Sequence, residues 1–160
     1  MLYFAFVYPL LLYGIAVYAN TCKSHLDKLM VLNNKILRIA QGRSIRTRTV
    51  NLYMEYNTLP LPALHQYEVI SFVHRCLYKD KSLPDLFIDY FYLNNSFHSY
   101  ATRSSDKIHL CSANSSFGNK GLKFKGSMLW NNLPRRLTEI QSHTVFKREL
   151  KVYLLQNLMT

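Results

Sequence analysis

The chain has 160 residues, of which 49% are hydrophobic and 18% are charged, and it contains only five Gly and five Pro. This composition excludes a collagen, a flexible linker and a disordered tail, and it predicts a single folded domain over residues 1–160. Twenty Lys and Arg stand against nine Asp and Glu, so the formal net charge is +11. Such an excess of positive charge favours a polyanionic partner, either nucleic acid or an anionic membrane surface.

The first segment, residues 1–19, is an uncharged apolar run. Its length is close to the roughly 20 residues that a helix needs to cross a bilayer, so a membrane-spanning segment is one alternative. Pro9 and Gly14 interrupt the run. The alternative that we favour is a core helix that neighbouring parts of a larger protein cover on every side. Without that cover, the exposed side chains would be those of Tyr3, Phe4, Phe6 and Leu10.

A second helix is predicted from Ser24 to Gly42, because Ser24 and Asp27 form a capping-box pattern and Gly42 provides a C-terminal stop. Basic residues occupy one side of this helix and continue into the loop after it, with no acidic residue between Asp27 and Glu55. Cations without counter-charge are expected to contact phosphates, the alternative being a solvated helix face. The residues are Lys28, Lys35, Arg38, Arg43, Arg46 and Arg48.

A third helix, residues 63–78, follows Pro62, which suits the first turn of a helix. It is apolar on most sides, so we expect it to be central to the fold. His65 and His74 lie on it without sharing a face, which predicts core or boundary histidines rather than catalytic ones. The remaining narrow polar stripe consists of Glu68, Ser71 and Arg75.

The C-terminal half carries shorter patterns. A short helical piece is predicted over residues 83–90, and alternating apolar and polar residues predict short strands at 107–111 and 122–125. A helix over 127–133 should end at Pro134. Trp130 is expected on the side of this helix that faces the core. A last helix should begin at Ser142 as its N-cap.

The predicted fold is therefore mainly α, with a short β or extended segment in the C-terminal half. Within the single domain, residues 1–90 form a helical part, residues 91–126 a loop with short strands, and residues 127–160 the C-terminal helices. Together these parts describe a helical domain of the size that one hydrophobic core supports.

No set of residues typical of an active site is present in the sequence. The three cysteines are an odd number and lie far apart, which argues against a disulfide framework and a zinc clasp. His109 and Cys111 have no second ligand pair at zinc spacing. Asp85 and Asp89 could perform acid–base chemistry, but no nucleophile lies near them in the sequence. We therefore expect no catalytic residue, no metal and no cofactor.

Three segments in the C-terminal half occur in a distinctive order: residues 98–103, residues 130–134 and residues 146–155. They resemble the region that follows the polymerase palm in non-LTR retrotransposon reverse transcriptases, the LINE-type and jockey-like elements. Residues 8–20 are similar to a segment of that family that usually reads tyrosine-glycine and then tryptophan-glycine. Tyr18 and Ala19 replace the last pair here. The resemblance spans nearly the whole chain.

The resemblance implies a fragment of an RNA-directed DNA polymerase, with a helical thumb-like domain that holds RNA and DNA template-primer through their phosphates. Such a polymerase needs palm carboxylates that bind two divalent ions, and this sequence has no adjacent Asp pair. The chain should therefore be inactive alone, with the upstream palm of the parent polymerase as its protein partner. A nuclear or cytoplasmic location is favoured over the membrane.

Further basic residues extend the expected contact with nucleic acid. Arg103 matches a motif position of the family, and a second basic strip consists of Lys120, Lys123 and Lys125. The open alternative in another class is a small basic membrane-anchored protein that uses residues 1–19 as its transmembrane segment.

Overall fold

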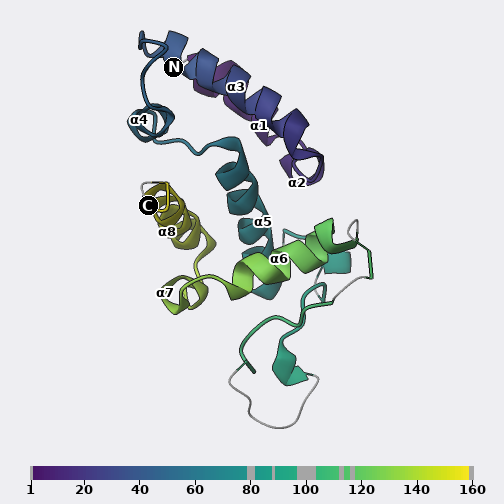
Figure 1. Ribbon diagram of the computed structural model, residues 1–160. Helices are drawn as coiled ribbons and strands as arrows, with labels where there is room; N and C mark the ends of the chain where they lie inside the picture. The colour runs from purple at the N-terminus through teal and green to yellow at the C-terminus, as the bar shows by residue number, and fades with distance from the viewer. Residues whose placement is uncertain are drawn as a thin grey trace. The chain divides into compact units, whose positions relative to one another are not determined.

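The computed structural model describes residues 2–78, 82–87, 89–96, 104–111, 114–115 and 118–158. The chain is mainly helical, which confirms the predicted fold class (Figure 1). Within the described residues, the only bridge between extended segments joins Leu93 and Ile108. The chain forms two compact units, each of which is described by itself. Unit 1 comprises residues 1–68 and 151–160, and unit 2 comprises residues 69–150.

The apolar run at the start of unit 1 is divided into short helical pieces, so the single helix expected there is wrong. They are the π-helix η1 (Tyr3–Val7) and the α-helices α1 (Tyr8–Leu12) and α2 (Ile15–Tyr18). Gly14 separates α1 from α2 with a φ of +67°, a conformation that glycine adopts without steric cost. Among the described residues, no helix has both the length and the apolar character of a membrane span.

The exposure of the large apolar residues near the N-terminus was predicted correctly except at one position. Phe4, Phe6 and Leu10 are exposed, with Phe6 at 67%. Tyr3, in contrast, is buried, and its hydroxyl donates a hydrogen bond to Asn33 Oδ1 at 3.1 Å. The prediction of an exposed Tyr3 is therefore wrong, because a polar partner on the neighbouring helix satisfies the phenol inside the core.

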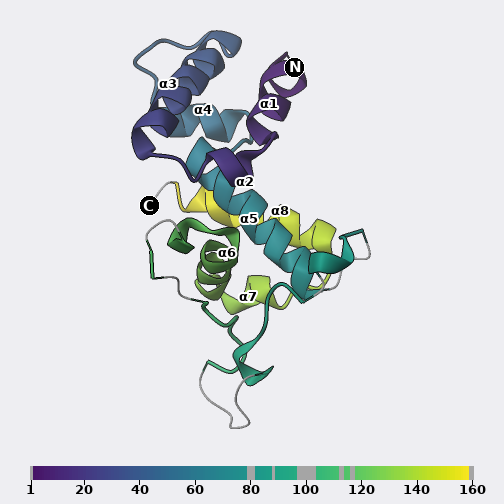
Figure 2. The same ribbon diagram turned by 90° about the vertical axis from the view of Figure 1, so that its right-hand side faces the viewer.

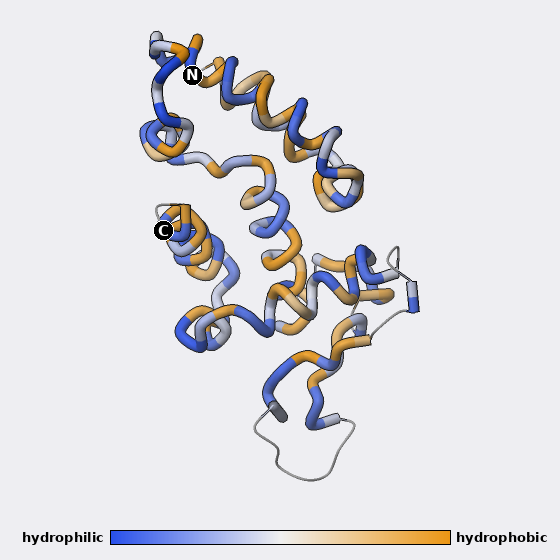
Figure 3. The backbone as a smooth tube through the Cα atoms, in the orientation of Figure 1, coloured by the Kyte–Doolittle hydropathy of each residue, from blue (hydrophilic) through white to orange (hydrophobic). Residues whose placement is uncertain are grey.

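Two helices that pack against each other form the rest of this core, α3 (Lys23–Ala40) and α4 (Thr49–Glu55). The π-helix η1 contacts α3 and leads into α1, and Figures 1 and 2 show α1, α3 and α4 of this unit from two sides. Hydrophobic and hydrophilic residues alternate along α3 in Figure 3. Leu37 and Leu52 are fully buried in a cluster with Tyr3 and Tyr53. The amphipathic pattern of the sequence thus produces a helix that buries one side.

The ends of α3 confirm one sequence signal and contradict the other. Gly42 has a φ of +59°, as expected for a glycine that follows a helix. The N-cap, however, is Cys22, which makes no side-chain cap hydrogen bond. The capping box at Ser24 is wrong because the helix begins at Lys23, one residue earlier, and Ser24 lies in its first turn.

The central helix of the prediction is α5 (Leu61–Leu77), and the boundary between the two units falls within it. Pro62 lies in its first turn as expected, and His65 and His74 are buried, which confirms them as core residues. Ser71 is also buried, so the predicted polar stripe is wrong at that position.

Unit 2 contains α6 (Leu122–Asn131), α7 (Arg135–Thr138) and the 3-10 turns η2 (Asp85–Phe87), η3 (Asn94–Ser96) and η4 (Gly118–Lys120). The strand predicted over residues 122–125 is wrong, because these residues form the first turn of α6. Four alternating residues are too few to distinguish a strand from a helix. The last helix, α8 (His143–Gln156), follows Ser142 as predicted and contributes to both units.

Close packing explains why α6 contains a glycine. A Cβ atom on Gly126 would lie 2.9 Å from Val73 Cγ2, closer than real Cβ atoms come, and 3.1 Å from Phe91 Cζ, which is tighter than most Cβ contacts. Gly126 therefore allows α6 to approach α5 and the segment around Phe91, a contact that any larger residue would push apart.

The tryptophan and asparagine that end α6 have separate structural roles. Trp130 is 5% exposed and its ring lies 5.7 Å from that of Phe146, which confirms it as a core residue. Asn131 binds both backbone groups of Ile108: its amide donates to the carbonyl oxygen at 2.8 Å, and its Oδ1 accepts from the backbone N–H at 2.9 Å. Pro134 then caps α7.

Candidate nucleic-acid interface

The first group of predicted binding residues lies in unit 1, on α3, in the loop after it and at the start of α4. Arg48 is the N-cap residue of α4, while Arg43 and Arg46 lie in the loop. All but Arg38 are exposed. We call this set the α3–α4 patch, and it consists of Lys28, Lys35, Arg38, Arg43, Arg46 and Arg48.

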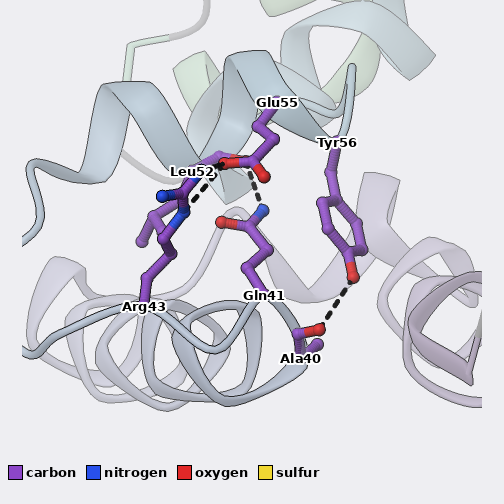
Figure 4. Close-up of polar contacts among 6 residues, drawn as sticks. All are labelled: Ala40, Gln41, Arg43, Leu52, Glu55 and Tyr56. Atoms are coloured by element: carbon purple, nitrogen blue, oxygen red, sulfur yellow. Dashed lines mark hydrogen bonds and ion pairs between the residues drawn. The ribbon is translucent and has the colours of Figure 1, made fainter.

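Hydrogen bonds join the C-terminal end of α3 to α4 and to the residue that follows α4 (Figure 4). Gln41 Nε2 donates to the carbonyl oxygen of Leu52 at 2.9 Å, and the Tyr56 hydroxyl donates to that of Ala40 at 3.2 Å. Both bonds satisfy carbonyl groups near the end of a helix. The loop that carries Arg43 and Arg46 thus connects two helices that are held together.

The α3–α4 patch contains a counter-charge that the sequence analysis did not place there. Glu55, at the end of α4, accepts from Arg43 Nε at 3.2 Å and from Arg43 Nη2 at 3.0 Å. The two side chains are 52% and 45% exposed. The interpretation of these cations as lacking any counter-charge is therefore wrong at Arg43. Exposed ion pairs contribute little, about 0–1 kcal/mol, so a phosphate could replace the carboxylate at small cost.

Arg38 differs from the rest of the patch because it is half-buried. Its Nη2 donates to the carbonyl oxygen of Thr47 at 3.2 Å, which ties α3 to the loop. Its Nε is buried and has no hydrogen-bond partner among the described residues. The position of Arg38 suits holding the loop, and its contact with phosphate stays a prediction.

A buried polar network supports the patch from inside unit 1. The Tyr53 hydroxyl donates to Asn34 Oδ1 at 2.6 Å and accepts from Asn33 Nδ2 at 3.2 Å. Asn33 in turn accepts from Tyr3. Tyr53 is 2% exposed, and burial raises its pKa from 10 to about 12. The folded protein therefore holds the Tyr53 proton more tightly than the unfolded chain does.

The raised pKa of Tyr53 predicts a loss of stability at high pH. Its contribution is complete below pH 10, the unfolded value, and is lost as the pH rises toward 12. Between about pH 9 and pH 11 the native protein should lose on the order of 1 kcal/mol that Tyr53→Phe does not lose. Denaturant titrations of both proteins at the two pH values measure this difference. Tyr13→Phe, at an 85% exposed position, should behave like the native protein; equal losses in all three would contradict the prediction.

The second group of predicted residues lies in unit 2. Lys120 ends η4 and is exposed, whereas Lys123 and Lys125 are half-buried on the first turns of α6. Burial lowers the pKa of Lys125, and the positive charge of Lys120 lowers it further. The repulsion between Lys120 and Lys125 makes an anion a favourable neighbour of these two side chains. We call Lys120, Lys123 and Lys125 the α6 patch.

Lys123 lies next to two tyrosines that the sequence analysis missed. Its Nζ is 5.5 Å from the ring centroids of both Tyr90 and Tyr92. The sequence signal was the alternation of Tyr90, Phe91 and Tyr92, in which Phe91 is buried and Tyr92 is 41% exposed. The prediction divided this alternation, because Tyr90 ended the helical piece expected over residues 83–90 and Tyr92 began the segment expected to be a loop with short strands.

The remaining predicted positions give less information. Arg103 lies outside the described residues, as do the other members of the 98–103 motif. The α3–α4 patch and the α6 patch lie in different units, so each is considered as a separate surface. Among the described residues, no three His, Cys, Asp or Glu side chains come together as a metal site would need.

Comparison of the chain with known protein families, curated proteins and solved structures finds no match. The two basic patches and the sequence motifs are the features of the chain that point to a function.

Proposed function

We propose that this chain is a non-catalytic C-terminal fragment of a non-LTR retrotransposon reverse transcriptase. In this proposal it binds the phosphate backbones of RNA and DNA without sequence preference. The observation that supports binding most directly is the exposed set of cations on α3 and its loop, with Glu55 as the single carboxylate that pairs with them among the described residues. The fragment origin is supported by the three C-terminal motifs and by the N-terminal one.

The physical basis of this binding is the release of counter-ions from the nucleic acid. Each phosphate that a Lys or Arg neutralises releases condensed cations, so the logarithm of the affinity falls linearly with the logarithm of the salt concentration. For duplex DNA the slope is about −0.9 for each neutralised phosphate. The slope is therefore a measure of how many phosphates of the nucleic acid are neutralised by Lys and Arg side chains.

Replacement of Arg43, Arg46 and Arg48 by alanine tests the α3–α4 patch. Loss of three phosphate contacts should make the slope shallower by about 2 to 3 units, and the affinity for unrelated sequences should fall equally. Fluorescence anisotropy with a labelled duplex at several salt concentrations measures both quantities.

A second triple variant provides a control of equal charge. Arg135, Arg136 and Arg148 are exposed residues of unit 2 outside both patches, and their replacement by alanine removes the same three charges. The slope of this variant should stay close to that of the native protein. If the two triple variants change the slope equally, net charge alone determines binding and the α3–α4 patch is not the site.

The proposed origin has its own test. The nucleotide sequence upstream of the Met1 codon should encode, in frame or after a recent frameshift, a polymerase palm with adjacent aspartates that bind the divalent ions. An unrelated promoter and untranslated leader at that place would contradict the fragment origin, without affecting the binding experiment.

A further inference from the structure

We propose that Tyr92, together with Lys123, forms a stacking platform for an unpaired base, so that unit 2 prefers single-stranded nucleic acid to a duplex. This inference deepens the proposed nucleic-acid binding and rests on it. The stacking of bases on exposed aromatic rings, combined with nearby cations for the backbone, is the general mode by which proteins bind single strands.

The backbone around Tyr92 is fixed, so the ring is held outward. On one side Phe91 is buried against the Gly126 position of α6. On the other side Leu93 forms the bridge with Ile108. The Tyr92 carbonyl oxygen accepts from the backbone N–H of His109 at 2.8 Å. With its backbone held on both sides, Tyr92 is 41% exposed, whereas Phe91 before it is 7% exposed.

The neighbouring ring and cation complete the platform. Tyr90 is anchored by edge-to-face contacts with Phe87 and Phe91, at centroid distances of 5.6 and 5.0 Å. Lys123 Nζ lies 5.5 Å from the centroid of the Tyr90 ring and 5.5 Å from the centroid of the Tyr92 ring. The ammonium group is thus available for a phosphate within reach of a base stacked on Tyr92.

The local charge also favours a strand over a neutral ligand. The pKa of Lys125 is lowered by burial and then by Lys120, so these positive charges repel each other. Lys107, which is exposed, lies on the segment whose backbone pairs with that of Asn94. An anionic backbone that passes over Tyr92 would relieve this repulsion. A duplex has its bases stacked inside, so it can use the lysines but not the ring.

The experiment compares a labelled 15-nucleotide oligo(dT) with a labelled duplex of the same length, using the full chain. We expect Tyr92→Leu to lose about tenfold in affinity for oligo(dT), because stacking contributes about 1–3 kcal/mol per base, and to keep its duplex affinity within about twofold. Tyr92→Phe keeps the ring and should bind both like the native protein. Tyr13→Leu removes a ring that is 85% exposed in unit 1 and is the matched control.

A second measurement remains decisive if Tyr92→Leu fails to fold. The native chain has one Trp, the buried Trp130. In Tyr92→Trp the new exposed indole should be quenched on addition of oligo(dT) and much less on addition of duplex. Two results would contradict the stacking platform and leave the proposed function unaffected. One is binding of oligo(dT) without quenching of the new Trp, and the other is an equal loss of affinity for oligo(dT) and duplex in Tyr92→Leu. If the native chain binds neither probe, the proposed function fails and the platform fails with it.

Discussion

Replacement of Phe146 by alanine is expected to destabilise unit 2 by about 3–5 kcal/mol, the usual cost of removing a fully buried aromatic side chain. Phe146 is 0% exposed, and its ring stacks on that of His74 at 4.1 Å. The substitution leaves a cavity next to a buried imidazole, whose Nε2 donates to the carbonyl oxygen of Ile140 at 2.8 Å. Few of these atoms can move to fill the space.

Fluorescence of Trp130 during denaturant unfolding measures this effect directly. Trp130 is the single Trp of the chain and its ring is 5.7 Å from Phe146, so the same cavity that reduces stability also changes its environment. Val145→Ala is the control, since Val145 is the preceding residue of α8 and is 39% exposed. It should change the free energy of unfolding by less than about 1 kcal/mol. A similar shift in both variants would show that Phe146 is not at the centre of the core.

The second large effect is expected in unit 1. Replacement of Leu37 by alanine should cost about 2–5 kcal/mol, because Leu37 is 0% exposed and packs with Leu52 and Tyr53 at the meeting of α3 and α4. Since the loop of the α3–α4 patch is tied to both helices, the variant should also bind nucleic acid more weakly near its unfolding midpoint. Circular dichroism during denaturant unfolding gives the stability.

An exposed residue of the same helix provides the comparison for Leu37. Ile39 is 72% exposed, so Ile39→Ala removes a similar aliphatic volume without opening a cavity. Its cost should stay near the few tenths of a kcal/mol typical of surface substitutions. Equal costs at the two positions would mean that α3 does not bury the side assigned to it.

The long helices could be predicted from sequence because periodicity and end signals agreed. The apolar spacing and Gly42 predicted α3 to within a few residues, and Pro62 and the apolar residues after it did the same for α5. In these segments local preference and burial favour the same structure. The short segments failed for the opposite reason. Residues 122–125 alternate like a strand, yet they form the first turn of α6, because four residues contain too little of either period to distinguish a helix from a strand.

Burial of polar groups was the part of the fold that the sequence did not reveal. Tyr3 was expected at the surface, but a residue distant in sequence can satisfy a hydroxyl inside the core, as Asn33 does for Tyr3. Such pairings depend on tertiary contacts and have no local pattern.

The sequence predicted which residues bring positive charge to the candidate site, but it did not predict how these residues are arranged in space. The cations of the α3–α4 patch are exposed as expected, apart from Arg38. The pairing of Arg43 with Glu55 could not be read from the sequence, because the two are separated by the loop that brings them together. Tyr92 was missed because its proposed role in stacking depends on Lys123, a cation of the separate helix α6 that lies beside its ring.

The division of the chain has a consequence for synthesis. Unit 1 contains both the first 68 residues and residues 151–160, and Leu154 and Leu155 are among its buried side chains. A ribosome releases the chain from the N terminus, so α3 and α4 emerge well before this last part of their unit. Residues 1–68 therefore stay without the last part of their unit until residues 151–160 have been made. A chaperone that binds exposed apolar segments would therefore have its longest opportunity at unit 1.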